Sequence, residues 1–329
     1  MPMAQGGSAL FLQLGLTVVL GFCARKIVAT TPVGPPFAAT VRTQINKLVI
    51  WLTMPALVFH TVHTAPLGPD VIQVPAAAIA GMAGTALVSW VLLARLYGRT
   101  PETGGLVLAA SAGSVSFFGI PIVRALFGPD EARVAVYFAV LNVPLALIAG
   151  ALISTHIAQA KAATGGVVSR TSAATIARVA LRQVFTIPAT WALIAGLALN
   201  GSPVPAPVDL LLRLLAGSVA PMTMFALGLG LSFERSLTPY RMALPAVAIK
   251  LAVSPLVVFV CASVIGLSGL PLAIVALQGA MPTQVLSVVV AERYRLNSRL
   301  VGLTLAMDTV LAFMFLPLVL GIIQTGVLS

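Results

Sequence analysis

Long apolar runs separated by short polar segments make up nearly the whole chain. A helix that crosses the hydrocarbon core of a bilayer needs about 20 apolar residues. Runs of that order, bounded by charges, glycines and prolines, predict helices at residues 8–24, 43–62, 71–96, 104–127, 133–158, 183–200, 208–232, 241–266, 269–291 and 299–324. The pattern therefore predicts an all-α integral membrane protein with ten transmembrane helices.

Composition and charge agree with a membrane protein. Of the 329 residues, 59% are hydrophobic and 8% are charged, against about 25% charged in ordinary soluble domains, which excludes a soluble globule. The net charge of +11 would suggest nucleic acid in a soluble protein. Because basic residues collect in the cytoplasmic loops of membrane proteins, we expect no nucleic-acid partner. Cys23 and Cys261 are too few and too far apart for a disulfide framework or a metal site.

The basic residues also predict the topology. Of the 19 Lys and Arg residues, Arg124, Arg133 and Arg213 flank loops on one side, Lys250 lies inside a helix, and the remaining 15 flank loops on the other side. The positive-inside rule then places both termini outside the cell.

Matching residues recur in the two halves of the chain. The pairs are Pro55 with Pro221, Pro121 with Pro282 and Asn142 with Asp308, separated by 166, 161 and 166 positions. We interpret residues 1–158 and 183–329 as two five-helix repeats joined by a cytoplasmic linker, residues 159–182. Because five is odd, the second repeat enters the membrane from the opposite side, and inverted repeats are common in secondary transporters.

Prolines in the fourth and ninth helices predict that both helices are broken. Proline removes a backbone donor and clashes with the preceding turn, and small residues accompany it in Gly119–Pro121 and Gly279–Pro282. The N-terminal ends of half-helices carry partial positive charge, which suits an anion. A simple kink is the alternative for each proline, whereas the matched pair favours a binding site for a small carboxylate.

Five segments resemble the auxin efflux carrier family, which includes plant auxin exporters and bacterial dicarboxylate permeases. The segments are NKLVIWLTMPALVF (46–59), FFGIPIV (117–123), MFALGLGL (224–231), AIKLAVSPLVVF (248–259) and AMPTQVLSVVVAERY (280–294). The resemblance implies two inverted five-helix repeats whose broken fourth and ninth helices cross at Pro121 and Pro282. It also implies a scaffold of helices one, two, six and seven, an elevator-like movement of the other helices, and, for a bacterial member, the cytoplasmic membrane.

The chain departs from the family pattern at two places. Family members often have Asn-Thr-Gly before the motif of the fourth helix, where this chain has Ser114, Val115 and Ser116, so a polar anchor for the substrate is changed. Asp308 stands where the family usually has a small hydroxyl residue, which leaves the coupling mechanism open.

Two charged residues lie deep inside predicted helices. Lys250 and Asp308 are each about ten residues from the cytoplasmic end of their helix, or roughly 15 Å at the helical rise. An isolated charge at that depth costs at least ~2.5 to 3.5 kcal/mol. We therefore expect an ion pair or proton site that couples transport, with Asn142 as its neutral counterpart. A static structural pair, or a Lys250 that extends towards the interface, is the alternative.

Small and polar residues beside the two breaks are the candidates for substrate binding. They are Ser114, Ser116, Gly119, Pro121, Gln278, Pro282, Thr283 and Gln284. Ser and Thr in membrane helices often bond to their own helix or to a neighbour instead, which favours Gln284 as a donor to a carboxylate. We expect His60 and His63 at the outer surface, without a required role.

The leading interpretation is a secondary active transporter of a small organic anion, a mono- or dicarboxylate similar to auxin, malonate or malate, linked to protons. A sodium-coupled symporter of the bile-acid type is the alternative. An intramembrane enzyme would need a set such as H-E-x-x-H, which the sequence lacks, and a sensor or channel stays open. We expect no cofactor and no metal, contacts with membrane lipids, and a homodimer as one oligomeric state that the sequence leaves open.

Overall fold

The computed structural model of the protein describes residues 2–30, 34–162, 178, 182, 185–230 and 237–327. Its regular elements are α-helices and short π-helical turns, and these residues contain no β-strand. The predicted all-α class is confirmed. Five helical stretches within this part of the chain are long and apolar enough to cross a membrane, namely 37–64, 70–97, 132–159, 206–230 and 238–264. The count of ten helices and their inverted pairing stay predictions.

The chain divides into two compact units, each built from segments distant in sequence. The first unit comprises Met1–Gly68, Ser116–Val136 and Phe185–Ser232, and the second comprises Pro69–Val115, Tyr137–Val184 and Phe233–Ser329. Each unit draws on both halves of the chain, so the units are distinct from the predicted repeats. The predicted linker lies largely outside the described residues, although its first four positions belong to a helix that continues to Ala162.

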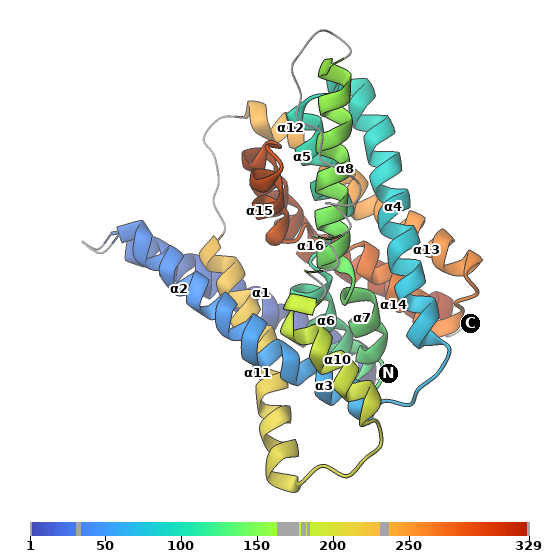
Figure 1. The fold of residues 1–329 in the computed structure, drawn as a ribbon. Coiled ribbons are helices and arrows are strands. Elements are labelled where there is room, and N and C mark those ends of the chain that lie inside the picture. The colour runs from blue at the N-terminus through green and yellow to red at the C-terminus, as the bar shows by residue number, and fades with distance from the viewer. Residues whose placement is uncertain are drawn as a thin grey trace. The chain divides into compact units, whose positions relative to one another are not determined.

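The first unit is a group of helices packed around one long helix. Its elements are α1 (Pro2–Ala29), α2 (Gly34–Leu48), α3 (Met54–Thr64), α6 (Ile120–Phe127), most of α7 (Ala132–Ala139), α10 (Pro188–Ala198) and α11 (Ala206–Gly230) (Figure 1). The long helix α11 packs against α1, α2 and α3, and α3 also packs against α10. Gly21 of α1 and Gly228 of α11 lie at the closest approach, where a Cβ on either would overlap the facing backbone.

We expect Gly228→Ala to destabilise the protein by about 1–3 kcal/mol, the usual cost of overpacking. The added Cβ would overlap the carbonyl oxygen of Val18, and backbone cannot move aside as a flexible side chain can. Gly217→Ala is the matched control, because Gly217 lies in the same helix with no atom within 4 Å of a Cβ. Thermal unfolding in detergent should show a lower midpoint for Gly228→Ala alone. Equal midpoints for the two variants would contradict the close packing of α1 on α11.

The second unit is centred on α5 (Pro101–Ser111). Its other elements are α4 (Asp70–Tyr97), α8 (Asn142–Ala162), α12 (Thr238–Ala248), α13 (Ser254–Val264), α14 (Gly269–Gly279), α15 (Leu286–Arg293) and α16 (Ser298–Val327) (Figure 1). Helix α5 contacts α4, α8, α12, α15 and α16, and its run from Leu106 to Ala110 is fully buried. Such an all-round apolar helix forms the core of this unit.

Three prolines, among them Pro121 of the predicted break, are accommodated by π-helical turns. The turns are η1 (Val49–Thr53), η2 (Val115–Gly119) and η3 (Ile249–Val253), which precede Pro55, Pro121 and Pro255. In η1 the amide of Met54 bonds to the carbonyl of Val49, five residues back. The wider turn removes the clash between the proline ring and the preceding carbonyl. The expected break at Gly119–Pro121 is therefore wrong, because the helix passes through Pro121 into α6.

An unexpected interruption divides the predicted helix at 133–158. Helix α7 ends at Ala139, two turn residues follow, and α8 begins at Asn142. Pro144 explains the interruption, because it has no amide hydrogen to bond the carbonyl of Val140 four residues earlier. Asn142 consequently lies at a helix start instead of within a continuous helix.

Candidate functional site

Two short non-helical segments meet inside the second unit. Helix α5 ends at Ser111 and α14 ends at Gly279, and the segments that follow pair in antiparallel orientation through Gly113 and Thr283. The amide of Ser114 donates to the carbonyl of Pro282 at 2.6 Å, and the amide of Gln284 donates to the carbonyl of Ala112 at 3.0 Å. Backbone amide and carbonyl groups that leave a helix inside a membrane need other hydrogen-bond partners. Each of the two segments provides such partners for the other.

This pairing corrects the predicted position of the crossing. Pro282 lies in the crossing segment of the ninth predicted helix, as expected. In the fourth predicted helix the break falls at Ala112–Ser114, upstream of Pro121. We call the residues 112–114 and 282–284 the crossing segments.

Two polar side chains, Asn142 and Asp308, support the crossing segments. Asn142 donates through Nδ2 to the carbonyl of Gly113 at 2.7 Å and to Oε1 of Gln284 at 2.8 Å. Asp308 accepts through Oδ2 from the amide of Thr283 at 2.9 Å and from its hydroxyl at 2.5 Å. Asn142 and Asp308, which the sequence paired by their spacing, thus both lie against the crossing segments.

A small buried cavity of about 20 Å³ lies beside the crossing segments. Its polar lining comes from Thr85, Ser111, Asn142, Lys250, Ser254 and Gln278, and Gly113 and Gly279 complete it. That volume admits about one water molecule, so it matches a functional group of a ligand and not a whole organic acid. None of the described residues that line the cavity is acidic.

Lys250 gives the cavity its positive charge. The side chain is 1% exposed, and a Cβ on Gly113 would lie only 2.9 Å from its Nζ, so the ammonium lies against the first crossing segment. Gln278 is fully buried, and neither its amide nitrogen nor its oxygen has a hydrogen-bond partner among the described residues. A buried cation beside an unpaired amide donor is an arrangement that can bind a carboxylate.

Lys250 and Asp308 are not joined directly in this structure. Within the described part of the chain, no ion pair of 4.0 Å or less connects them. The Asp308 carboxylate uses Oδ2 to hold Thr283, while its Oδ1 is buried and has no partner among the described residues. Lys250 therefore lines the cavity, whereas Asp308 bonds to the second crossing segment.

The structure brings only some of the predicted site residues to the cavity. Gln278, Asn142 and Lys250 line it. The other predicted residues of the second unit, at or beside the crossing segments, are Ser114, Pro282, Thr283, Gln284 and Asp308. Ser116, Gly119 and Pro121 belong to the first unit.

Sequence reasoning missed several residues that line the cavity. Ser254 follows Lys250 by four residues, so the helical period would have placed the two on one face. Gly113 lies in the first crossing segment, and its lack of a side chain leaves space for the Lys250 ammonium. Thr85 belongs to α4, and no local signal connects it to the crossing segments.

Broken helices that meet within an apolar helical unit, beside unpaired polar groups, are features of membrane transporters. The family model described as "Membrane transport protein" matches residues 12–320. The chain belongs to this family, which confirms the resemblance to the auxin efflux carriers. The protein is therefore a membrane transporter.

Two similar proteins are named as uncharacterized transporters. The one from Methanothermobacter thermautotrophicus is 28% identical over 320 residues, which cover 95% of this chain and 97% of the relative. The one from Methanocaldococcus jannaschii is 19% identical over 278 residues, covering 83% of this chain and 87% of the relative. Both organisms are archaea, so the bacterial cytoplasmic membrane stays a prediction.

Proposed function

We propose that the protein is a secondary active transporter that binds the carboxylate of a small organic anion in the cavity beside the crossing segments. The observation that carries the proposal is the buried Lys250 ammonium, which lines this cavity together with Gln278 and Asn142. A carboxylate would neutralise the lysine and accept from the free amide of Gln278. Both contributions favour an anion over a neutral solute or a cation.

The proposed substrates are mono- and dicarboxylates similar in size to malonate, malate or auxin. The cavity of about 20 Å³ accepts only part of such a molecule, so transport requires it to widen in another conformation. An elevator-like movement is supported by the division of the chain into two compact units. The first unit contains the predicted helices one, two, six and seven, which the resemblance implies as the scaffold, together with residues 116–136 of the predicted helices four and five. The second unit contains Lys250 and both crossing segments.

We propose that Asp308 links transport to protons. Its Oδ1 is buried and unpartnered among the described residues, so a proton can be held there without displacing Thr283 from Oδ2. Because Thr283 lies in the second crossing segment, a change at Asp308 acts directly on the backbone beside the cavity. Lys250 and Asn142 complete the proposed coupling group.

A sodium-coupled symporter is the second candidate. The observation in its favour is the same unpaired Oδ1 of Asp308, because sodium requires several oxygen ligands at close range and the Thr309 hydroxyl is also buried without a partner among the described residues. The Lys250 ammonium opposes a cation in the neighbouring cavity, which makes the proton-linked transporter the better supported candidate.

Uptake into sealed proteoliposomes tests the proposal. We expect saturable uptake of one or more radiolabelled carboxylates, from a panel of malonate, malate, succinate and indole-3-acetate, driven by a proton gradient without sodium. Liposomes without protein and Lys250→Met are the controls. Accumulation that requires a sodium gradient would favour the second candidate. No uptake by folded protein in either gradient would contradict the anion assignment.

A further inference from the structure

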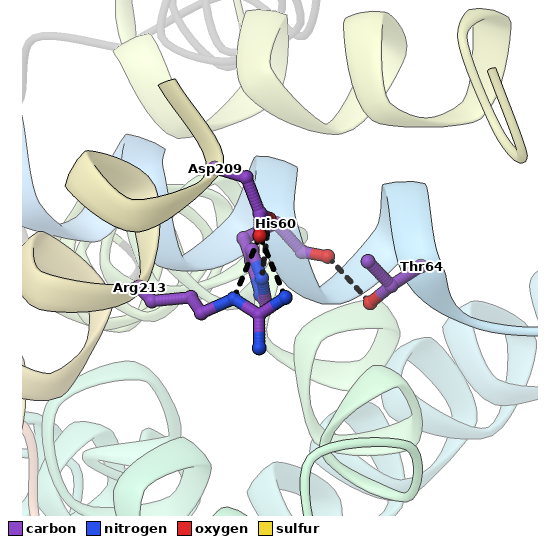
Figure 2. Close-up of polar contacts among 4 residues, drawn as sticks. All are labelled: His60, Thr64, Asp209 and Arg213. Atoms are coloured by element: carbon purple, nitrogen blue, oxygen red, sulfur yellow. Dashed lines mark hydrogen bonds and ion pairs between the residues drawn. The ribbon is translucent and has the colours of Figure 1, made fainter. Parts of the chain in front are cut away.

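A charged cluster in the first unit lies outside the proposed transport site. Figure 2 shows dashed lines from the Asp209 carboxylate to both the Arg213 guanidinium and the His60 ring. Arg213 donates from Nε and Nη2 to Oδ2 of Asp209 at 2.8 and 2.6 Å, and Nε2 of His60 lies 3.4 Å from Oδ1. Thr64 donates to the backbone carbonyl of His60 at 2.8 Å and fixes that turn of α3. One carboxylate therefore holds two basic groups in place.

A further arginine approaches this cluster, and no ion pair among the described residues involves it. Arg124 lies in the last turn of α6 and interacts electrostatically with both His60 and Arg213. Its Nη1 is buried, and no described residue provides a hydrogen-bond partner for it. Arg124 and Arg213 carry two positive charges against the single charge of Asp209, before any protonation of His60. The cluster therefore carries an excess of positive charge and an unused guanidinium donor.

The predicted topology makes these two arginines unusual. Arg124 and Arg213 are two of the three basic residues assigned to the side opposite the basic loops, and the fold brings both to one place. His60 and His63 are each only 8% exposed within α3, so neither is a solvent-exposed side chain, and their place on the outer side stays a prediction. A partly buried cationic cluster on the sparsely charged side points to a ligand, because such charges are costly to hold near a membrane without a partner.

We propose that Arg124, Arg213 and His60 form a second anion site, which binds a carboxylate on the outer side of the first unit. Asp209 orients Arg213 and His60, while the ligand takes the free donor of Arg124 and the exposed end of Arg213, whose side chain is 63% exposed. A cationic site at this position raises the local concentration of anionic substrate. The assignment of the ligand as substrate rests on the proposed function, whereas the binding of a small carboxylate does not.

Calorimetric titration with malonate separates this site from the cavity. In Lys250→Met, where the proposed transport site is disabled, we expect one remaining malonate site. Adding Arg124→Gln should weaken that site at least tenfold, whereas Arg124→Lys, which keeps the charge, should weaken it less. Arg133→Gln is the matched control, because it removes an equal charge from a side chain already paired with Glu131 at 3.7 Å.

An unchanged affinity in Lys250→Met carrying Arg124→Gln would overturn the second site, as would an equal loss in Arg133→Gln. If Arg124→Gln does not fold, Arg213→Gln at the more exposed position provides the same comparison with the same expected loss. Failure of wild-type proteoliposomes to transport carboxylates would contradict the proposed function while leaving this binding result to stand. The two proposals therefore fail independently.

Discussion

Lys250→Met is expected to lower carboxylate transport by about 10–100-fold, the equivalent of one hydrogen bond to a charged group worth about 1.5–3 kcal/mol. Methionine fills similar space with an apolar chain. The Lys250 ammonium is almost fully buried and has no ion pair within 4.0 Å among the described residues. Lys250 and Asp308 interact electrostatically without forming an ion pair, and the cost of burying the ammonium exceeds that weaker attraction, so the unfolding midpoint should stay unchanged or rise.

The combination of lost transport and retained stability is the diagnostic result. Lys47→Met is the matched control, because Lys47 is exposed at the end of α2 and its removal changes the net charge equally. Initial uptake rates against substrate concentration, measured with unfolding midpoints in detergent, separate the two effects. A Lys250→Met variant that unfolds much more easily and retains wild-type affinity would identify the lysine as structural.

Asp308→Asn is expected to retain carboxylate exchange but to lose accumulation driven by a proton gradient. Asparagine keeps an oxygen that accepts from the amide and hydroxyl of Thr283, which now bond to Oδ2 of Asp308. Because asparagine cannot gain and release a proton, the variant keeps the bonds to Thr283 in the crossing segment and loses the coupling. Counterflow at equal pH and uptake at unequal pH, measured on the same vesicles, distinguish the two activities.

Asp308→Leu separates coupling from structural support. Leucine leaves the Thr283 amide without an acceptor, whereas the Thr283 hydroxyl can still donate to the carbonyl of Ala109 at 3.0 Å. An unsatisfied buried polar group costs about 1–3 kcal/mol. We expect this variant to unfold at a clearly lower temperature than Asp308→Asn and to lose exchange as well. Proton-driven accumulation by Asp308→Asn at the wild-type level would contradict the coupling role.

The sequence predicted the polar side chains of the site better than the position of its helix breaks. Depth within an apolar run was sufficient to single out Lys250, because a charge at that depth requires a specific environment. The spacing of Asn142 and Asp308 predicted related positions, and each bonds to a crossing segment. These signals are local or periodic, so they can be read without knowledge of the tertiary structure.

The break at Ala112–Ser114 could not be predicted in the same way. A proline was expected to mark the break in the fourth predicted helix. Instead, a π-helical turn accommodates Pro121, and the observed break at 112–114 contains no proline. That backbone leaves the helix where its amide and carbonyl groups bond to Pro282 and Gln284, far along the chain. Such a break depends on partners that only the folded unit supplies.

The most direct test of the central claim is to locate a bound carboxylate. Crystals of the protein grown with 5-bromoindole-3-acetate, whose ring-bound bromine does not alkylate side chains, would reveal the bromine by anomalous diffraction, and the account predicts a peak near the crossing segments with the carboxylate within hydrogen-bond reach of Lys250 Nζ and Gln278. The same crystals should place a second peak near Arg124. Bromine density elsewhere, with the cavity beside Lys250 empty at saturating 5-bromoindole-3-acetate, would contradict the assignment of this cavity as the anion site.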